Sequence, residues 1–215
     1  MKFEKTEVWG FEHAIRGMRN PLESWDKSDS CYIDKRFNDQ FHIGKNDLAL
    51  MQKLIKAGSE HRKFLRQIFV SVDITAPLYF FKELDTYKVG TAANSTSTMH
   101  KLASTPITID CFEMDDFEDC KDDSNVYVSV IWIESITRLE KLRQTYNATK
   151  DKRYWKELIR LLPESWLQKR TITMNYENIL NMYRQRKNHK LTEWSKSFCD
   201  WVKTLPYAEE LICLE

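Results

Sequence analysis

Amides and an arginine that suit a planar, charged ligand fall close together near the C-terminal end of the sequence. Asn175 stands where a predicted strand gives way to a predicted helix over 176–186, and Asn178 and Asn181 share one face of that helix. Arg186 ends it. An amide offers a donor and an acceptor, as a pyrimidine or isoalloxazine edge requires, and an arginine clamps a phosphate with parallel hydrogen bonds. The spacing by itself is more typical of an N-cap, a surface amide and a helix C-terminal arginine, and both interpretations stay open.

A run of small and hydroxyl-bearing residues over 89–104, VGTAANSTSTMHKLAS, is the second group that could do chemistry. Asn94, Ser95 and Ser97 lie near its centre, and Lys88 comes directly before it. Small residues let backbone amides approach an anion, and clustered hydroxyls add hydrogen-bond donors. The run therefore predicts either a phosphate-binding loop or a surface loop with serine turn chemistry.

His61 lies in a basic cluster with Arg62, Lys63 and Arg66, between a predicted helix and a predicted strand. A lone histidine is more often structural than catalytic. The five cysteines lack the spacing of a zinc site, so no metal site is expected. The sequence has no Walker A loop and no GxGxxG, GxSxG or HExxH motif, which disfavours the enzyme classes that carry them. The catalytic residues therefore stay unknown.

Hydrophobic periodicity and turn residues indicate which elements must hold these side chains. Strands are predicted over 3–9, 67–74 and 170–174, and helices over 12–18, 47–57, 78–84, 126–146, 152–161, 176–186 and 191–203. Asn46 is expected to cap the helix over 47–57, and the polar segment 19–44 to form a long loop. The stretch 110–123 is crowded with carboxylates but lacks the glycine turn and alternating ligands of a calcium loop, which predicts a solvated acidic insertion.

Length and composition favour one globular unit. At 215 residues, 42% of them hydrophobic, the chain can bury a full-sized core, and a single domain over 1–215 is predicted. The net charge of +1 gives no field that would gather nucleic acid or an anionic membrane, so neither partner is expected. The sequence has no apolar run of membrane-spanning length and no apolar signal core at its start, and a cytoplasmic location with reduced cysteines is expected.

Two stretches of the sequence resemble the flavin-dependent thymidylate synthase family. In the first, LALMQKLIKAG is followed by His61, the strand IFVSVDI, the helix LYFFKEL and an N-x-x-S loop at Asn94 to Ser97. In the second, ELIRLLPESWLQKRTITMNYENILNMYRQR resembles an E-x-A-R-x-x-L-P segment followed without a gap by a T-x-N-x-R-S-L-x-x-F-x-x-x-R helix. Together they cover roughly residues 45–105 and 150–205.

The resemblance implies an α+β fold with a mixed sheet and a helical layer, and a homotetramer whose flavin sites are shared between subunits. The family's reaction uses FAD to carry a hydride from NADPH to deoxyuridylate, with methylene tetrahydrofolate as the carbon donor. FAD and a small-molecule nucleotide are the implied ligands. The implied cofactor-binding residues are Asn175, Asn181, His61 and Lys190, and the implied substrate-binding residues are Arg186, Lys88, Asn94, Ser95, Ser97 and Arg160.

Several positions depart from the family pattern, and most are lost cations. With Asn94 and Ser97 held in place, Tyr87, Val89 and Met99 replace arginines of the signature loop. A shift by one residue would instead place Lys88 at the third position of the motif but lose the match of the asparagine. Ile159 stands where an arginine precedes the LLP segment, with Arg160 one position away, and Glu177 replaces an arginine of the 176–186 helix. Each lost charge-assisted hydrogen bond is worth about 1.5–3 kcal/mol, so ordinary deoxyuridylate methylation is disfavoured.

Three functions remain open from the sequence. The first is a divergent flavoprotein that acts on a different nucleotide, in which the cofactor carries the chemistry and no protein nucleophile is needed. The second is a non-catalytic oligomer that keeps the fold for ligand binding or protein interaction. The third is an active thymidylate synthase with a rearranged phosphate site.

Overall fold

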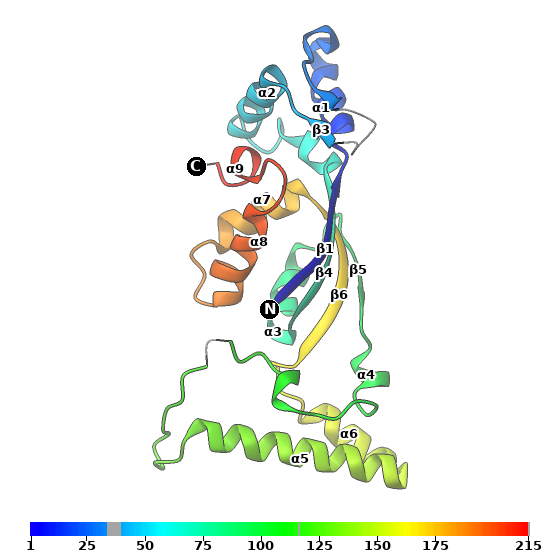
Figure 1. The fold of residues 1–215 in the computed structure, drawn as a ribbon, viewed down its shortest axis with the longest axis vertical. Helices are drawn as coiled ribbons and strands as arrows, with labels where there is room; N and C mark the ends of the chain where they lie inside the picture. Colours follow the sequence, from blue (N-terminus) through cyan, green and yellow to red (C-terminus); the bar gives the residue numbers. More distant parts are fainter. Residues whose placement is uncertain (34–39, 116, 215) are drawn as a thin grey trace. The chain divides into compact units, whose positions relative to one another are not determined.

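The structure is a computed structural model that describes residues 1–33, 40–115 and 117–214 (Figure 1). The chain divides into two compact units. Unit 1 comprises Met1–Lys2, Ile74–Thr86 and Asn94–Arg170, and unit 2 comprises Phe3–Asp73, Tyr87–Ala93 and Thr171–Glu215. The single domain predicted over 1–215 stays a prediction.

Four strands form one sheet among the described residues, in the order β1-β4-β6-β5. They are β1 (Lys2–Trp9), β4 (Phe69–Pro77), β6 (Leu167–Asn175) and β5 (Ala92–Ser95), and each contributes residues to both units. β4 is rich in β-branched residues, which suit a buried, pleated surface, and Val70, Val72 and Ile74 are almost fully buried. The three predicted strands are confirmed by β1, β4 and β6.

Besides its strands, unit 2 contains short helices and turns. They are α1 (Phe11–Arg19), η1 (Asn20–Leu22), η2 (Trp25–Lys27), α2 (Lys45–Lys56), η3 (Lys63–Gln67), α7 (Tyr176–Arg186), the π-helical turn η6 (Glu193–Phe198), α8 (Cys199–Lys203) and α9 (Ala208–Leu211). Tyr176 and Trp194 are fully buried, and the Tyr176 hydroxyl donates to the carbonyl oxygen of Pro206 at 2.6 Å. This anchor fixes the start of α7 in the core, so its remaining side chains have defined positions.

Unit 1 contains the remaining helices. They are α3 (Leu78–Leu84), α4 (Thr98–Lys101), η5 (Ile109–Cys111), α5 (Val128–Thr149) and α6 (Lys152–Arg160), and the turn η4 (Asp85–Tyr87) leads from unit 1 into unit 2. α5 and α6 lie side by side (Figure 1). They bury Leu139 and Leu158 against a cluster that contains Leu102, Ile107 and Phe112. This core ties the segment after β5 to the helix pair.

The prediction of a long loop over 19–44 is wrong for part of the segment. Besides η1 and η2, it contains an antiparallel hairpin of β2 (Cys31–Ile33) and β3 (Gln40–His42), while residues 34–39 lie outside the described residues. β2 is exposed and lacks the apolar alternation by which a strand is predicted. Polar residues organise the segment instead, because the buried Asp47 carboxylate accepts hydrogen bonds from Arg19 and Ser30, both at 2.6 Å.

The prediction that Asn46 caps the second helix is also wrong. α2 begins at Lys45, and Gly44 occupies the N-cap position. The Asp29 carboxylate accepts from the backbone amides of Asn46 at 2.9 Å and Asp47 at 3.1 Å, so an acid from the preceding loop satisfies the helix start. A Cβ at Gly44 would lie 2.2 Å from the Asp29 side chain, which explains the glycine.

Most predicted helices are confirmed within a few residues, and α7 has the bounds that were predicted. The sequence did not predict β5, α4 or α9, which are short and lack a periodic apolar pattern. Acidic residues of the 110–123 stretch are mostly exposed, and Asp116 within it lies outside the described residues. No described helix combines the length and the apolarity needed to cross a membrane.

Candidate functional site

The start of α7 is held by a reciprocal pair of asparagines. The Asn175 Oδ1 atom accepts from the backbone amide of Asn178 at 3.0 Å, and the Asn178 Oδ1 atom accepts from the backbone amide of Asn175 at 3.2 Å. The N-cap interpretation of Asn175 therefore holds for its oxygen. Its amide nitrogen lies 3.5 Å from where a Cβ on Gly90 would sit, and no acceptor among the described residues meets it. Asn175 keeps one free donor.

One face of α7 carries Glu177, Asn181 and Arg184, which are spaced by four and three residues. The side chain of Arg62 crosses to this face from just before η3. Its Nη2 atom donates to Asn181 Oδ1 at 3.0 Å, and its Nε atom donates to Glu177 Oε1 at 3.4 Å. Arg66 donates to the other Glu177 oxygen, and this bond raises the pKa of the Arg66 guanidinium. A buried carboxylate thus joins two arginines that are distant from it in sequence.

Arg184 adds a third guanidinium to the same face. Burial, and then the like charge of Arg62, lower the pKa of Arg184 from its ordinary value. No acidic partner of Arg184 occurs among the described residues. We call Arg62, Arg66, Arg184 and Glu177 the arginine cluster. The cluster holds three guanidinium groups and one carboxylate, so it carries two positive charges in excess and is suited to an anion.

The end of α7 holds Arg186 against two aromatic rings. Its Nε atom donates to the Tyr87 hydroxyl at 3.0 Å, and its guanidinium carbon lies 5.5 Å from the Tyr87 ring centre and 5.3 Å from that of Trp194. The Tyr87 hydroxyl in turn donates to Gln185 Oε1 at 2.8 Å. Tyr87 therefore positions Arg186 through a hydrogen bond and a cation–π contact.

The other predicted residues of unit 2 are exposed. His61 precedes Arg62 and donates its backbone amide to the carbonyl of Gly58 at 3.1 Å. The carbonyl of Lys88 accepts from the Thr91 amide at 3.0 Å, and Lys190 lies in the connection that follows α7. His61 thus lies beside the arginine cluster in sequence. Residues that sequence reasoning did not assign to the site are Arg62, Arg66, Arg184 and Tyr87.

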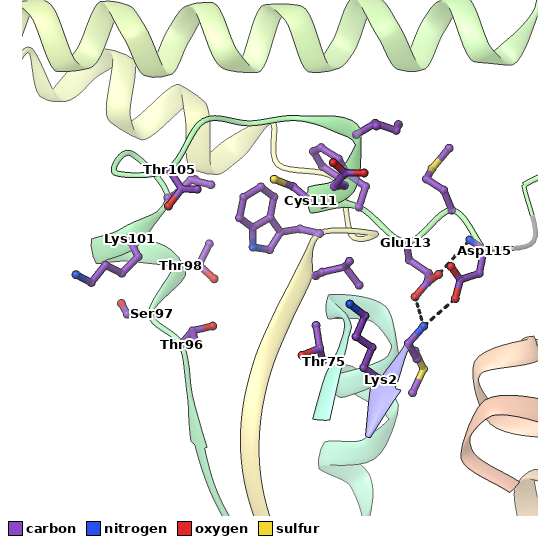
Figure 2. Close-up of a pocket in the computed structure, with 18 residues that line it drawn as sticks. Lys2, Thr75, Thr96, Ser97, Thr98, Lys101, Thr105, Cys111, Glu113 and Asp115 are labelled. Carbon is purple, nitrogen blue, oxygen red and sulfur yellow. Dashed lines mark hydrogen bonds and ion pairs between the residues drawn. The ribbon is translucent and has the colours of Figure 1, made fainter. Parts of the chain in front are cut away.

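A hollow of about 710 Å³ lies in unit 1 (Figure 2). Thr96, Ser97, Thr98 and Lys101 line one side, and Glu113 and Asp115 lie across from them, where both carboxylates contact the Met1 amine at 2.9 Å. Leu102, Phe112 and Trp166 provide apolar wall. The hollow therefore combines hydroxyl donors and a lysine on one side with an acidic pair on the other.

Hydrogen bonds to neighbouring elements fix the hydroxyl side of this hollow. Gln168 on β6 donates to the Thr96 carbonyl at 3.0 Å, and the Thr96 amide donates to the carbonyl of Lys169 at 2.9 Å. Ser97 Oγ accepts from the His100 amide at 3.2 Å, and the Trp155 indole of α6 donates to the Met99 carbonyl at 3.2 Å. The hydroxyl loop is thus held between β6 and α6.

Of the residues predicted to bind the substrate and its phosphate, only some line the hollow. Ser97 lines it, whereas Asn94 and Ser95 are exposed on β5 and are not among its lining residues. Arg160 lies on α6 outside the lining, and its Nη1 atom pairs with Glu157 Oε1 at 2.5 Å. In the part of the chain that the structure describes, no group of three or more histidine, cysteine, aspartate and glutamate side chains is arranged to hold a metal ion.

No family model and no curated protein matches the chain. Solved structures do match it. A crystal structure of the flavin-dependent thymidylate synthase ThyX from Helicobacter pylori complexed with FAD and dUMP has a TM-score of 0.70 at 17% identity, with 100% of both chains covered. A second structure of ThyX from Helicobacter pylori with FAD and dUMP has a TM-score of 0.72 at 16% identity, with 99% of this chain and 97% of that chain covered. The chain therefore has the α+β fold of these enzymes over its full length.

Proposed function

We propose that this chain is a divergent member of the flavin-dependent thymidylate synthases that binds FAD, with a nucleotide other than deoxyuridylate as its partner ligand. The arginine cluster is the observation that carries the proposal. Where the family pattern has an arginine, this chain has Glu177, and Arg62 and Arg66 meet that carboxylate from η3 and the residue before it. Positive charge beside Asn181 therefore comes from Arg62 and Arg66, and not from an arginine on α7 at position 177.

The arginine cluster and the two amides fit different parts of a flavin dinucleotide. Three guanidinium groups with two excess positive charges suit a diphosphate. The Asn181 oxygen is taken by Arg62 and the Asn175 oxygen by the helix N-cap, so each amide retains its nitrogen as a donor. Such donors suit the carbonyl oxygens of a flavin or pyrimidine ring. FAD, when bound, would supply the hydride chemistry, for which no protein nucleophile is required.

The substrate side differs more from the family pattern. Tyr87, Val89 and Met99 stand at arginine positions, and Arg186 is engaged by Tyr87 and Trp194. The hydroxyls of Thr96, Ser97 and Thr98 with Lys101 supply donors but little charge. A monophosphate that depends on several arginines would bind weakly there. We therefore propose a substrate with less negative charge than deoxyuridylate.

Flavin binding by the purified full chain tests this proposal. The wild-type protein should show flavin absorbance at about 450 nm or take up added FAD with quenching of flavin fluorescence. Arg184→Gln removes a guanidinium without breaking an ion pair, and it should weaken FAD binding by about tenfold. Asn175→Asp keeps an N-cap oxygen but deletes the free donor, and it should also weaken binding.

Arg138→Gln is the matched control, because Arg138 is an exposed arginine on α5 that pairs with Glu134. It should bind FAD like the wild type. Riboflavin, which lacks phosphates, should bind more weakly than FAD to the wild type and lose little affinity in Arg184→Gln. Failure of the wild-type protein to take up FAD at millimolar concentration, or unchanged affinity in both site variants, would exclude the proposal.

A second candidate is a non-catalytic oligomer that keeps the fold for interaction. The apolar, exposed start of α5 favours it, since Val130 is 51% and Ile133 is 65% exposed. The loss of family arginines at Tyr87, Val89 and Met99 is also what disuse of a catalytic site would produce. We propose the homotetramer that the family resemblance implies for both candidates, but this candidate predicts no flavin uptake.

A further inference from the structure

A second hollow, of about 280 Å³, lies within unit 2 and is lined mainly by aromatic rings. We call it the aromatic pocket. Its rings are those of Trp9, Phe11, Tyr32, Phe41 and Tyr207, contributed by the end of β1, the start of α1, the β2–β3 hairpin and the turn before α9. The pocket is separate from the arginine cluster and from the residues of the proposed flavin site.

Ring–ring contacts hold the side chains of this pocket in place, and two of the rings stay partly exposed. Tyr32 and Phe41 meet edge to face with ring centres 5.1 Å apart, and Phe11 and Tyr207 do so at 5.6 Å. Trp9 and Tyr32 each remain 44% exposed. Trp9 also stacks on Phe69 with ring centres 5.8 Å apart, so its partly exposed ring is held by a neighbour and can meet a ligand at little entropic cost.

One carboxylate sets the charge of the aromatic pocket. Glu12 lies at the start of α1, and its Oε2 atom accepts from the Tyr32 hydroxyl at 3.0 Å, which fixes the carboxylate at the pocket. No lysine or arginine is among the described residues that line the pocket. Apart from Glu12 and the tyrosines, the titratable residue in this described lining is His13. The pocket therefore has a negative bias and aromatic walls.

We propose that the aromatic pocket binds a methylated ammonium group of a small molecule. A quaternary or methylated ammonium is attracted by ring faces and by a nearby carboxylate, whereas an anion is repelled and a neutral apolar group gains nothing from Glu12. The volume of about 280 Å³ is slightly below that of typical drug-sized sites, which fits a compact head group. The inference does not depend on flavin binding.

Calorimetric titration of the full chain with choline tests the proposal, and 3,3-dimethylbutanol serves as the uncharged isostere. Choline should bind about tenfold more tightly than the isostere. Glu12→Gln preserves the side-chain shape and the tyrosine contact but removes the charge, and it should reduce choline affinity about tenfold while leaving the isostere unchanged. Trp9→Leu should weaken both ligands. Glu23→Gln, at an exposed position outside the pocket, is the matched control and should bind choline like the wild type.

Competition between choline and a trimethyllysine peptide distinguishes a small-molecule ligand from a methylated protein. If choline and the peptide compete with similar affinity, a small molecule is supported as the ligand. If the peptide binds at least tenfold more tightly and Glu12→Gln abolishes the difference, the chemistry holds but the occupant is a methylated protein. The proposal is overturned if choline does not bind at millimolar concentration, if the isostere binds equally well, or if Glu12→Gln leaves choline binding unchanged. Thermal unfolding of each variant verifies that the fold is intact.

Discussion

Glu177 is buried, and its charge is balanced by arginines that come from another element. Arg62, whose side chain is 11% exposed, and Arg66, whose side chain is 57% exposed, each donate to one of its oxygens. Removing the carboxylate would leave the guanidinium groups of Arg62 and Arg66 without their shared counter-charge. The carboxylate therefore positions these two arginines of the cluster.

Glu177→Gln should lower the free energy of unfolding by about 1–3 kcal/mol, because both charge-assisted bonds weaken and the arginines repel. Urea unfolding at neutral pH measures this loss. In a double-mutant cycle with Arg66→Gln, the two changes should be less than additive, since each removes the same pair. Glu157→Gln, which breaks an exposed pair with Arg160, is the control and should cost less than about 0.5 kcal/mol. Strict additivity in the cycle would show that the pair is not coupled.

At the scale of elements, α5 fixes the segment that precedes the hollow of unit 1. The Glu140 carboxylate accepts from the backbone amide of Ile107 at 2.8 Å and from Arg143 Nη2 at 2.6 Å, and Arg143 donates to the Ala103 carbonyl at 3.1 Å. Chiefly through the Arg143 bond, the pKa of Glu140 falls from 4.5 to about 2. The ionised carboxylate thus ties α5 to the chain that follows α4.

This lowered pKa predicts an acid dependence of stability. A carboxylate with a lowered pKa in the folded state stabilises the fold fully above its unfolded pKa of 4.5, and that contribution is lost as the pH falls through about 2. Glu140→Gln should reduce stability at neutral pH and flatten the decline between these values, as measured by urea midpoints at each pH. Glu134→Gln, an exposed acid on the same helix, should keep the wild-type slope. A Glu140→Gln profile parallel to that of the wild type would contradict the assignment.

The elements that could be predicted from sequence are those with strong local signals. β4 has alternating β-branched residues, and α7 follows an asparagine N-cap and keeps one apolar face, so both elements could be predicted. β5 has none of these signals because Ala92–Ser95 is exposed. The arginine cluster could not be predicted either, since Arg62 and Glu177 are 115 residues apart and meet only through the fold. The sequence singles out Asn181 and Arg186 as candidates, but it does not predict that Arg62 contacts Asn181 or that the rings of Tyr87 and Trp194 contact Arg186.

At the scale of the whole molecule, the start of α5 indicates how copies of the chain would associate. One face of the helix buries Leu139 and partly buries Ile136 in the core of unit 1, while Val130, Ile131 and Ile133 are 45–65% exposed. A helix that is apolar on all sides is normally buried, so this part of α5 is suited to a second copy of the chain. Further along α5, the exposed positions are polar, as at Lys141 and Gln144, which limits the apolar surface to the first turns.

The proposed homotetramer should therefore dissociate when a charge is placed on the start of α5. Ile133→Asp buries a carboxylate at the subunit contact, and it should shift the sedimentation coefficient to that of a smaller species while the helix content stays unchanged, because Ile133 is 65% exposed in the isolated chain. Lys156→Asp, at an exposed position on α6, should keep the wild-type assembly. If Ile133→Asp dissociates the protein and the wild type takes up no FAD, the non-catalytic oligomer is favoured. If the wild-type protein sediments as a monomer at all concentrations, the homotetramer is excluded for both proposed functions.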